Sequence, residues 1–277
     1  MAAIFGLDAF SPLQIAAKIE TIGVAKAHLP ILPTLMLGAL AGVFIGLGAL
    51  YYTVVISDSQ LSFGAARVLG GLAFSLGLIL CVIAGAELFT GNNLLVMAWA
   101  DRKISTAELL RNWTLVYAAN AAGAIGLAAV VYFSQHADMN QGAVGLAYLK
   151  IAAAKTAMPF GEAFFKGILC NLLVCLAVWI ALAGHTVTDK VLAIVFPVSA
   201  FVAAGFEHSV ANMYFIPLGI FLKSGGTAAA GVNTNALDWS GFAGNLLPVT
   251  LGNIVGGSVM VALAYYVIYG RHARAGG

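Results

Sequence analysis

Six long apolar runs dominate this chain and limit the ways in which it can fold. They lie near residues 33–55, 65–100, 108–133, 161–184, 190–222 and 245–269. A helix needs about 20 apolar residues to cross the hydrocarbon core of a bilayer, so each run is long enough for one span. Hydrophobic residues make up 61% of the chain and charged residues 9%, against roughly 45–50% and about 25% in soluble domains. We therefore predict an all-α membrane protein with six transmembrane helices.

The segments outside these runs are short. Residues 11–28 place apolar side chains among Lys18, Glu20 and Lys26, which is typical of an amphipathic helix on the membrane surface or against a neighbouring subunit. Ser11 and Pro12 have the residue types that favour a helix start. We predict an N-terminal amphipathic segment over 1–30, a six-span transmembrane domain over 31–270 and a short tail over 271–277.

The distribution of Lys and Arg predicts the orientation of the chain. Cytoplasmic loops of membrane proteins are enriched in these residues. If the N-terminus is cytoplasmic, that side holds eight of the 13, namely Lys18, Lys26, Arg102, Lys103, Arg111, Lys190, Arg271 and Arg274. We therefore expect both termini in the cytoplasm. The net charge of +2 and the lack of any basic run exclude nucleic acid as a partner.

Two of the runs, 65–100 and 190–222, are longer than a simple span and contain a glutamate near the middle. Residues 84–92 read AGAELFTGN and residues 204–212 read AGFEHSVAN, so both match A-G-x-E-x-x-x-x-N at an offset of 120 residues. A charge inside the membrane costs about 2.5–3.5 kcal/mol on insertion scales. Irregular backbone survives there only where protein buries it or where it lines a cavity. We predict two inverted three-helix repeats with broken second and fifth helices.

Several longer segments resemble the formate/nitrite transporter family. They are GGLAFSLGLILCVIAGAELFTGNN (70–93), KTAMPFGEAFFKGILCNLLVCLAVW (155–179), GFEHSVANMYFIPLGI (205–220) and NLLPVTLGNIVGG (245–257). FSLGLILC, CLAVW, FEHSVANM and YYVIYGR resemble bacterial formate channels in particular. The resemblance implies an aquaporin-like protomer, assembled as a homopentamer in the bacterial inner membrane, with one pore in each protomer.

The resemblance also implies which residues form the pore. Thr90 lies in the loop that interrupts the second span and His208 lies at the break in the fifth, so the two are expected to meet at the pore centre. The other polar residues expected in the substrate path are Lys155, Asn171, Glu207 and Asn212. Apolar constrictions are expected at Phe74, Leu78, Leu88, Phe89 and Phe201.

Without the family resemblance, the same residues would be interpreted as structural rather than as pore residues. His208 is the one mid-membrane histidine and would be a buried neutral side chain, and Lys155 would be a solvated loop residue. Thr90 would satisfy its own backbone, and Asn171 would clasp two helices. For Glu87 we expect a structural role, in which its carboxylate accepts hydrogen bonds from backbone amides freed by the break.

The expected function is the passage of a small monovalent anion, formate first, with nitrite or hydrosulfide as alternatives. Two mechanisms stay open: conduction of the anion, or proton exchange with His208, whose residue type has an unperturbed pKa of about 6.5. The absence of H-E-x-x-H and G-x-S-x-G motifs argues against an enzyme, so no catalytic residue, metal or cofactor is expected. The alternative function from a different class is a facilitator of neutral solutes, although the Asn-Pro-Ala pair of aquaporins is missing.

Overall fold

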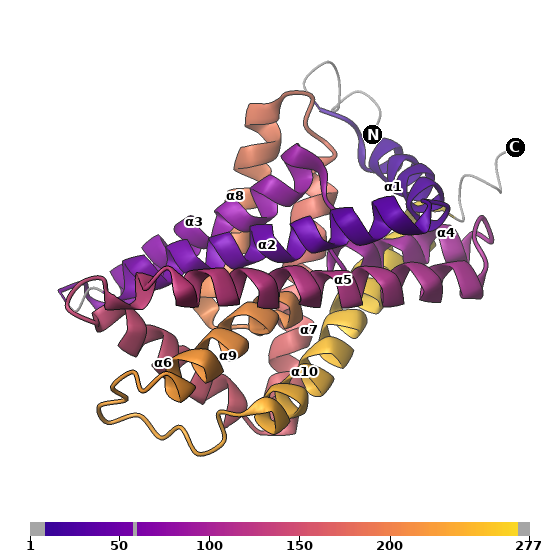
Figure 1. Cartoon of the computed structure of the whole chain (residues 1–277). Coiled ribbons are helices and arrows are strands. Elements are labelled where there is room, and N and C mark those ends of the chain that lie inside the picture. The colour runs from indigo at the N-terminus through magenta and orange to yellow at the C-terminus, as the bar shows by residue number, and fades with distance from the viewer. Residues whose placement is uncertain (1–8, 58–59, 271–277) are drawn as a thin grey trace, which may run out of the picture.

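Six helices of the computed structural model, which describes residues 9–57 and 60–270, are long and apolar enough to cross a membrane (Figure 1). Their bounds are Ile31–Ile56, Phe63–Gly85, Thr106–Phe133, Phe160–Ala181, Val187–Ala204 and Trp239–Gly270. The predicted all-α fold with six spans is confirmed. The predicted tail over 271–277 lies outside the described residues, and the domain boundary at residue 30 stays a prediction.

The helices pack in the same order in both halves of the chain. The first half contains α2 (Ile31–Ile56), α3 (Phe63–Leu80) and α5 (Thr106–Phe133), and the second contains α7 (Phe160–Ala181), α8 (Val187–Ala204) and α10 (Trp239–Ile254). α2 contacts α3 and α5, and α7 contacts α8 and α10. α3 and α8, the helices that precede Glu87 and Glu207 in the two long runs, also contact each other. This arrangement brings the two interruptions together.

Both of these spans are interrupted. α3 continues as a π-helical segment, η1 (Cys81–Gly85), and the chain resumes as the 3₁₀-helix η2 (Gly91–Leu95) and α4 (Val96–Ala100). α8 ends at Ala204 and α9 (Ser209–Ser224) begins beyond a short irregular stretch. Gly85 and Gly205 have φ angles of 83° and 77°, a left-handed conformation that glycine adopts without a steric penalty. This explains the glycine shared by the two motifs.

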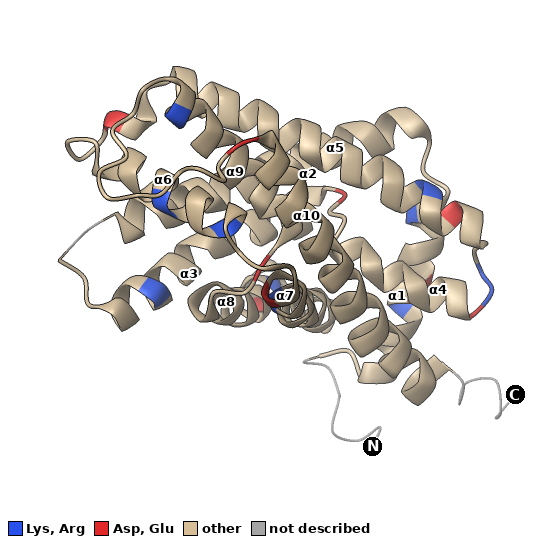
Figure 2. Cartoon of the chain, turned by 90° about the horizontal axis from the view of Figure 1, so that it is seen from below, with Lys and Arg blue, Asp and Glu red and all other residues tan. Residues whose placement is uncertain are grey.

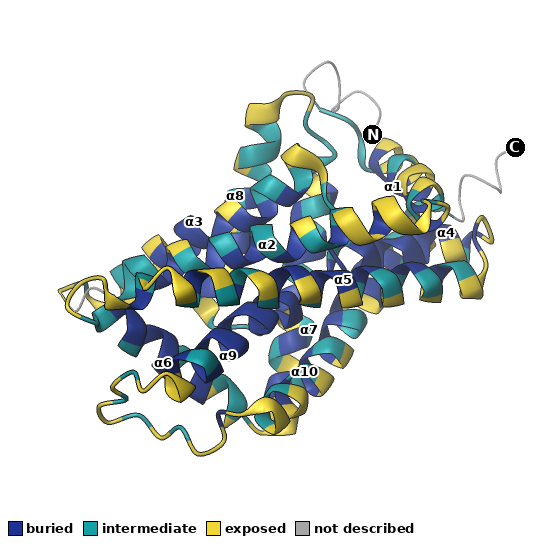
Figure 3. Cartoon of the chain, in the orientation of Figure 1, coloured by how far each residue is buried: buried dark blue, intermediate teal, exposed yellow. Residues whose placement is uncertain are grey.

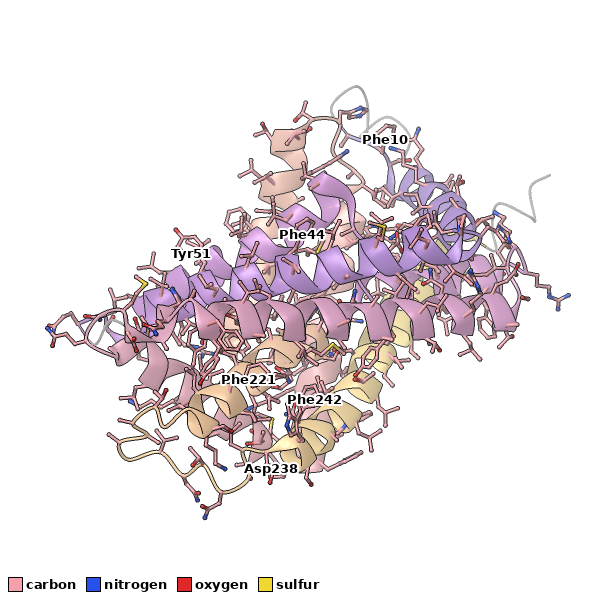
Figure 4. The ribbon with its side chains drawn as sticks, viewed as in Figure 1. Phe10, Phe44, Tyr51, Phe221, Asp238 and Phe242 are labelled. Carbon is pink, nitrogen blue, oxygen red and sulfur yellow. The ribbon has the colours of Figure 1, made fainter. Side chains whose placement is uncertain are left out.

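Side-chain caps define where several helices begin. Asp238 stands before α10 and accepts a hydrogen bond of 2.8 Å from the Gly241 amide (Figure 4). Such caps satisfy amides that have no partner inside the helix. Reciprocal capping boxes occur at α1, α5 and α8, formed by Ser11 with Gln14, Ser105 with Glu108, and Thr186 with Asp189. The helix start expected at Ser11 and Pro12 is therefore correct.

Helix α1 (Pro12–Ala27) packs on its own chain. Ile15, Ala16 and Ile19 are buried in a cluster that includes Leu95 and Met97 of η2 and α4. The buried side of α1 covers the end of the interrupted second span, and the expected location at the membrane surface or against a neighbouring subunit stays a prediction. The helix also contacts η5 (Tyr266–Gly270), so the first and last described helices lie at the same side of the bundle (Figure 1).

A second short helix, α6 (Ala143–Thr156), was not predicted. It precedes α7 as α1 precedes α2, and it packs against α9. α9 itself is buried along nearly its whole length (Figure 3). Most charged residues lie toward the two ends of the bundle, near α1 and α4 at one end and near α6 at the other (Figure 2).

The ammonium of Lys103 links the loop after α4 to α1. It forms an ion pair with the buried carboxylate of Glu20, and its Nζ lies 3.1 Å from Oδ2 of Asp101. The hydrogen bond to Glu20 raises the pKa of Lys103, so the side chain stays charged at physiological pH. The cation therefore compensates two carboxylates at the inner surface of α1.

Lys103→Met should loosen α1. The change leaves Glu20 as a buried carboxylate without its cation, at a cost on the order of 1–2 kcal/mol because Lys103 is itself half exposed. Hydrogen–deuterium exchange of the α1 amides in reconstituted protein should become faster. Arg102→Met, at the adjacent exposed position, is the matched control and should leave α1 protected. Equal exchange in the wild type and Lys103→Met would show that this ion pair does not hold the helix.

Candidate functional site

The two chain interruptions meet through one side-chain contact. Oγ1 of Thr90 lies 3.0 Å from Nε2 of His208. Both residues are buried, with 0% and 3% of their surface exposed. Thr90 directly precedes η2, and His208 directly precedes α9 and acts as its N-cap. The structure therefore places together the two residues expected at the pore centre.

Hydrogen bonds around His208 define its protonation state. Nδ1 accepts a hydrogen bond of 3.1 Å from the Ala211 amide, so Nδ1 carries no hydrogen in this arrangement. The neutral ring then has its hydrogen on Nε2, which faces Thr90. Thr90 accepts this hydrogen bond, and its own hydroxyl hydrogen remains available to another acceptor. The ring also lies against Phe201, with centroids 6.0 Å apart and planes at 19°.

Lys155, Glu207 and Asn212, all expected in the substrate path, form one cluster. Nζ of Lys155 donates to Oε1 of Glu207 at 2.8 Å, and Nδ2 of Asn212 donates to Oε2 at 2.7 Å. Nδ2 of Asn212 also lies 2.7 Å from Oδ1 of Asn245, whose Nδ2 donates to the Lys155 carbonyl at 2.9 Å. The buried glutamate is thus compensated by one cation and one amide, and α6 supplies the cation.

The first half of the chain repeats this cluster with other residues. Nζ of Lys26 lies 2.9 Å from Oε1 of Glu87, and Nδ2 of Asn92 donates to Oε2 at 2.7 Å. Asn92 also donates to Asn112 at 3.0 Å, and Asn112 donates to the Lys26 carbonyl at 3.1 Å. We expected Glu87 to accept bonds from backbone amides, which was wrong: its carboxylate accepts them from Lys26 and Asn92. Lys26 and Asn112 were missed as members of the site.

Two further asparagines, Asn120 on α5 and Asn253 on α10, hold the broken backbone. Each uses its amide group to satisfy one carbonyl and one N–H at a break, so these polar groups are not left unpaired inside the membrane. The bonds join Asn120 Nδ2 to the Glu87 carbonyl (2.8 Å), the Phe89 amide to Asn120 Oδ1 (2.9 Å), Asn253 Nδ2 to the Glu207 carbonyl (3.0 Å) and the Ser209 amide to Asn253 Oδ1 (3.0 Å). Neither asparagine was singled out from the sequence.

Asn171 positions Thr90. Its Nδ2 lies within hydrogen-bonding distance of the Thr90 carbonyl (3.2 Å), the Asn253 carbonyl (2.7 Å) and Oδ1 of Asn93 (3.1 Å). Sγ of Cys175, one turn further along α7, also donates to the Thr90 carbonyl at 3.3 Å. Asn171 therefore links the two breaks, as an interhelical clasp would, and its bonds are to protein groups.

Two cavities border the two breaks, one at each break. The α1 vestibule, about 440 Å³, is lined by Lys26, Leu78, Gly85, Glu87, Leu88 and Asn92 among others. The α6 vestibule, about 540 Å³, is lined by Arg67, Phe74, Lys155, Phe201, Glu207 and His208 among others. The two cavities share no lining residue.

Four of the five predicted constriction residues line one of the two cavities, and the fifth lines neither. Leu78 and Leu88 line the α1 vestibule, whereas Phe74 and Phe201 line the α6 vestibule and pack edge to face at 5.8 Å between centroids. Phe89 lines neither cavity and instead packs on Trp113 and Tyr117 of α5. We therefore assign Phe89 to helix packing, because its ring is turned away from both vestibules.

No group of three or more His, Cys, Asp or Glu side chains in residues 9–57 and 60–270 is arranged to hold a metal ion. Cys81, Cys170 and Cys175 are buried free thiols. The polar groups near the two breaks are instead the Thr90 hydroxyl, the His208 ring and the lysine–glutamate–asparagine clusters.

Comparison with known proteins identifies this arrangement. The family model for formate/nitrite transporters matches residues 13–267. The formate channel FocA of Escherichia coli strain K12 is 41% identical over 273 residues, covering 95% of this chain and 96% of FocA. A probable formate transporter of Methanothermobacter thermautotrophicus is 40% identical over 277 residues, covering 94% of this chain and 97% of the relative.

Two solved structures share the fold. One, described as a pentameric formate channel with formate bound, is 42% identical with a TM-score of 0.79 and covers 86% of this chain and 97% of that structure. The other, an ion channel of the same family, is 31% identical with a TM-score of 0.81, covering 92% of this chain and 98% of that structure. With its two matched breaks and the family model matching almost the whole sequence, the chain belongs to the formate/nitrite transporter family.

Proposed function

We propose that this protein is a transmembrane pore for small monovalent anions, with formate as the main substrate, and that it transports rather than catalyses. The observation that carries the proposal is the Thr90–His208 contact, which joins the two breaks, each of them bordering a cavity lined by at least one lysine. Relatives named as formate channels support the choice of formate. Nitrite or hydrosulfide is the alternative within the same family.

The assembly is proposed as a homopentamer with one pore in each protomer, in the bacterial inner membrane. The solved pentameric relative supports this. Large apolar side chains such as Tyr51 of α2 and Phe165 of α7 are more than half exposed on the protomer, and lipid or a second subunit would cover them. Both termini are proposed to be cytoplasmic, which the contact of α1 with η5 supports.

An anion would be attracted first by the lysine of a vestibule. Each lysine is paired with a glutamate, so its ammonium would attract an anion at short range, through the hydrogen bonds that it donates rather than through a net charge of the cluster. The apolar side chains beyond them, Leu78 and Leu88 on one side and Phe74 and Phe201 on the other, form a barrier to a bare ion. The anion therefore needs hydrogen bonds or a proton at the centre to pass.

Thr90 and His208 would supply both. The hydroxyl hydrogen of Thr90 is free to donate to an anion, because Thr90 accepts its bond from Nε2 of His208. A cationic histidine carries a hydrogen on both ring nitrogens, so protonation of His208 breaks the bond from the Ala211 amide to Nδ1. We propose that an anion next to His208 compensates this loss, and that a proton then passes to the anion, which crosses as the neutral acid.

Labelled formate should enter liposomes containing the wild-type protein much faster than protein-free liposomes, without a rise in osmotic water permeability. A large excess of nitrite or hydrosulfide in the same assay reports the order of preference among anions. A rise in water permeability without formate uptake would instead favour the rival facilitator of neutral solutes.

His208→Asn should abolish proton-coupled, pH-dependent formate uptake, because an amide does not exchange protons in this range. Asparagine keeps an oxygen that can accept from the Ala211 amide, so the start of α9 is preserved. The measurement is formate flux with a pH-sensitive dye inside the liposomes. His28→Asn, at an exposed helix end, is the control and should behave as the wild type. Undiminished proton-coupled uptake by His208→Asn would refute the mechanism.

Thr90→Val should lower formate flux by roughly tenfold or more, since one hydrogen bond in a buried site is worth on the order of 1–3 kcal/mol. Valine has the shape of threonine but leaves Nε2–H of His208 without an acceptor and offers no hydrogen to the anion. Thr90→Ser keeps the hydroxyl and should retain most of the flux. If Thr90→Val retains the flux and Thr90→Ser loses it, the methyl group rather than the hydroxyl is required.

A further inference from the structure

The guanidinium of Arg67 covers the end of α8 inside the α6 vestibule. Its Nε donates to the Ala203 carbonyl and its Nη2 to the Val202 carbonyl, both at 2.8 Å. A third bond of 3.3 Å runs from Nη1 to the hydroxyl of Tyr52 on α2. Arg67 thus fills its planar fork with partners from two helices, which a lysine would not match.

The covered carbonyls belong to the last turn of α8, which ends at Ala204 with Gly205 as its cap. The final carbonyls of a helix lack partners within the helix and carry a partial charge of about −0.5 in total. This negative end, at Ala204, lies at the fifth-span break, four residues before His208. Arg67, Gly205 and His208 line the same cavity. Left uncovered, it would repel an anion close to the point where His208 must meet it.

The inverted repeat shows that this arginine is an addition rather than part of the shared framework. At the offset of 120 residues that aligns the two motifs, the position corresponding to Arg67 is Val187, which is uncharged. The lysine–glutamate–asparagine clusters, in contrast, are present in both halves. The lysine and glutamate charges cancel in each cluster. The α6 vestibule is also lined by Lys150 and by Lys166, which pairs with Glu162. Arg67 adds positive charge there directly at the end of α8, whereas no described residue that lines the α1 vestibule is an arginine.

We infer that Arg67 is a positioning residue for anion access: it neutralises the negative end of α8 and keeps the α6 vestibule attractive to anions up to His208. The inference rests on the proposed transport of anions. It predicts a one-sided effect, because the charge lies in the α6 vestibule. Removal of Arg67 should weaken anion capture from that side and leave capture from the α1 vestibule nearly unchanged.

The test compares Arg67→Gln with the wild type from each side of the membrane. Labelled formate uptake is measured in right-side-out spheroplasts and in inverted vesicles of the same cells, at several formate and salt concentrations. In the preparation whose outer face carries the α6 vestibule, the half-saturating formate concentration should rise roughly fivefold, while the maximal rate changes less than twofold. In the other preparation, the half-saturating concentration should stay nearly unchanged. In the preparation that exposes the α6 vestibule, the half-saturating concentration of Arg67→Gln should depend less on ionic strength than that of the wild type, because the variant lacks the charge that salt would screen.

Three further variants separate charge from folding. Arg67→Lys keeps the positive charge but not the planar guanidinium, and its half-saturating formate concentration should be close to that of the wild type. Arg67→Met is a second neutral variant should the glutamine variant fail to assemble. Arg111→Gln is the matched control, because Arg111 also donates to backbone carbonyls, those of Ala27 and Leu29 at the end of α1. It should leave half-saturation from the α6 side unchanged.

Two results would overturn the inference. An unchanged half-saturation from both sides would show that the charge of Arg67 does not act on the anion. An equal loss of maximal rate from both sides, with half-saturation and salt dependence intact, would mark Arg67 as purely structural. Wild-type uptake is measured first: if the wild type does not transport formate, the proposed function fails, whereas transport without an Arg67 effect counts against this inference alone.

Discussion

The structure depends on satisfying backbone polar groups where two membrane helices are interrupted. Unpaired amides and carbonyls inside a bilayer cost several kcal/mol each, and the breaks at 86–90 and 205–208 expose several. Asn120 and Asn253 bond to this backbone directly. Asn92 and Asn212 hold the buried glutamates that follow Gly85 and Gly205. Without these amide side chains, the chain could not present Thr90 and His208 at the centre of the bundle.

The two halves contain the same lysine–glutamate–asparagine cluster but differ in the contacts of the lysine, the side chain available to an anion. Nζ of Lys26 bonds both Glu87 and Asn92. Nζ of Lys155 bonds Glu207 and lies 5.6 Å from the Phe215 ring, and Oδ1 of Asn212 has no hydrogen-bond partner within the described part of the chain. Lys155 therefore keeps more of its donor capacity for a ligand than Lys26 does.

Much of this arrangement could be predicted from the sequence because it repeats there. The A-G-x-E-x-x-x-x-N motif marks both breaks, since the left-handed glycine and the asparagine that bonds the glutamate recur at fixed spacing. Lys26 escaped prediction because a lysine on an amphipathic helix reads as a solvated residue, and its partner Glu87 is distant in sequence. The motif offset of 120 residues also places Leu146, and not Lys155, opposite Lys26, so the repeat did not pair the two lysines.

Other features were beyond prediction because packing rather than sequence pattern decides them. The ring of Phe89 turns toward α5, where Trp113 and Tyr117 surround it, and no periodicity shows which way a loop residue points. α6 has a short alanine-rich sequence that is too short for a span, so only its contact with α9 shows what it does. In each case, the contact joins residues from different helices.

His208 ties the charge of the substrate to the position of a proton. The amide of Ala211 occupies Nδ1 in the resting arrangement, so a proton alone would have to break a helix-capping bond and place an uncompensated cation between Phe201 and Thr90. An anion alone would meet an apolar barrier with one hydroxyl donor. Only the two together lower both costs, because the anion compensates the imidazolium and the imidazolium supplies the proton. We therefore propose that the geometry of this one capped helix favours paired passage of anion and proton over passage of either alone.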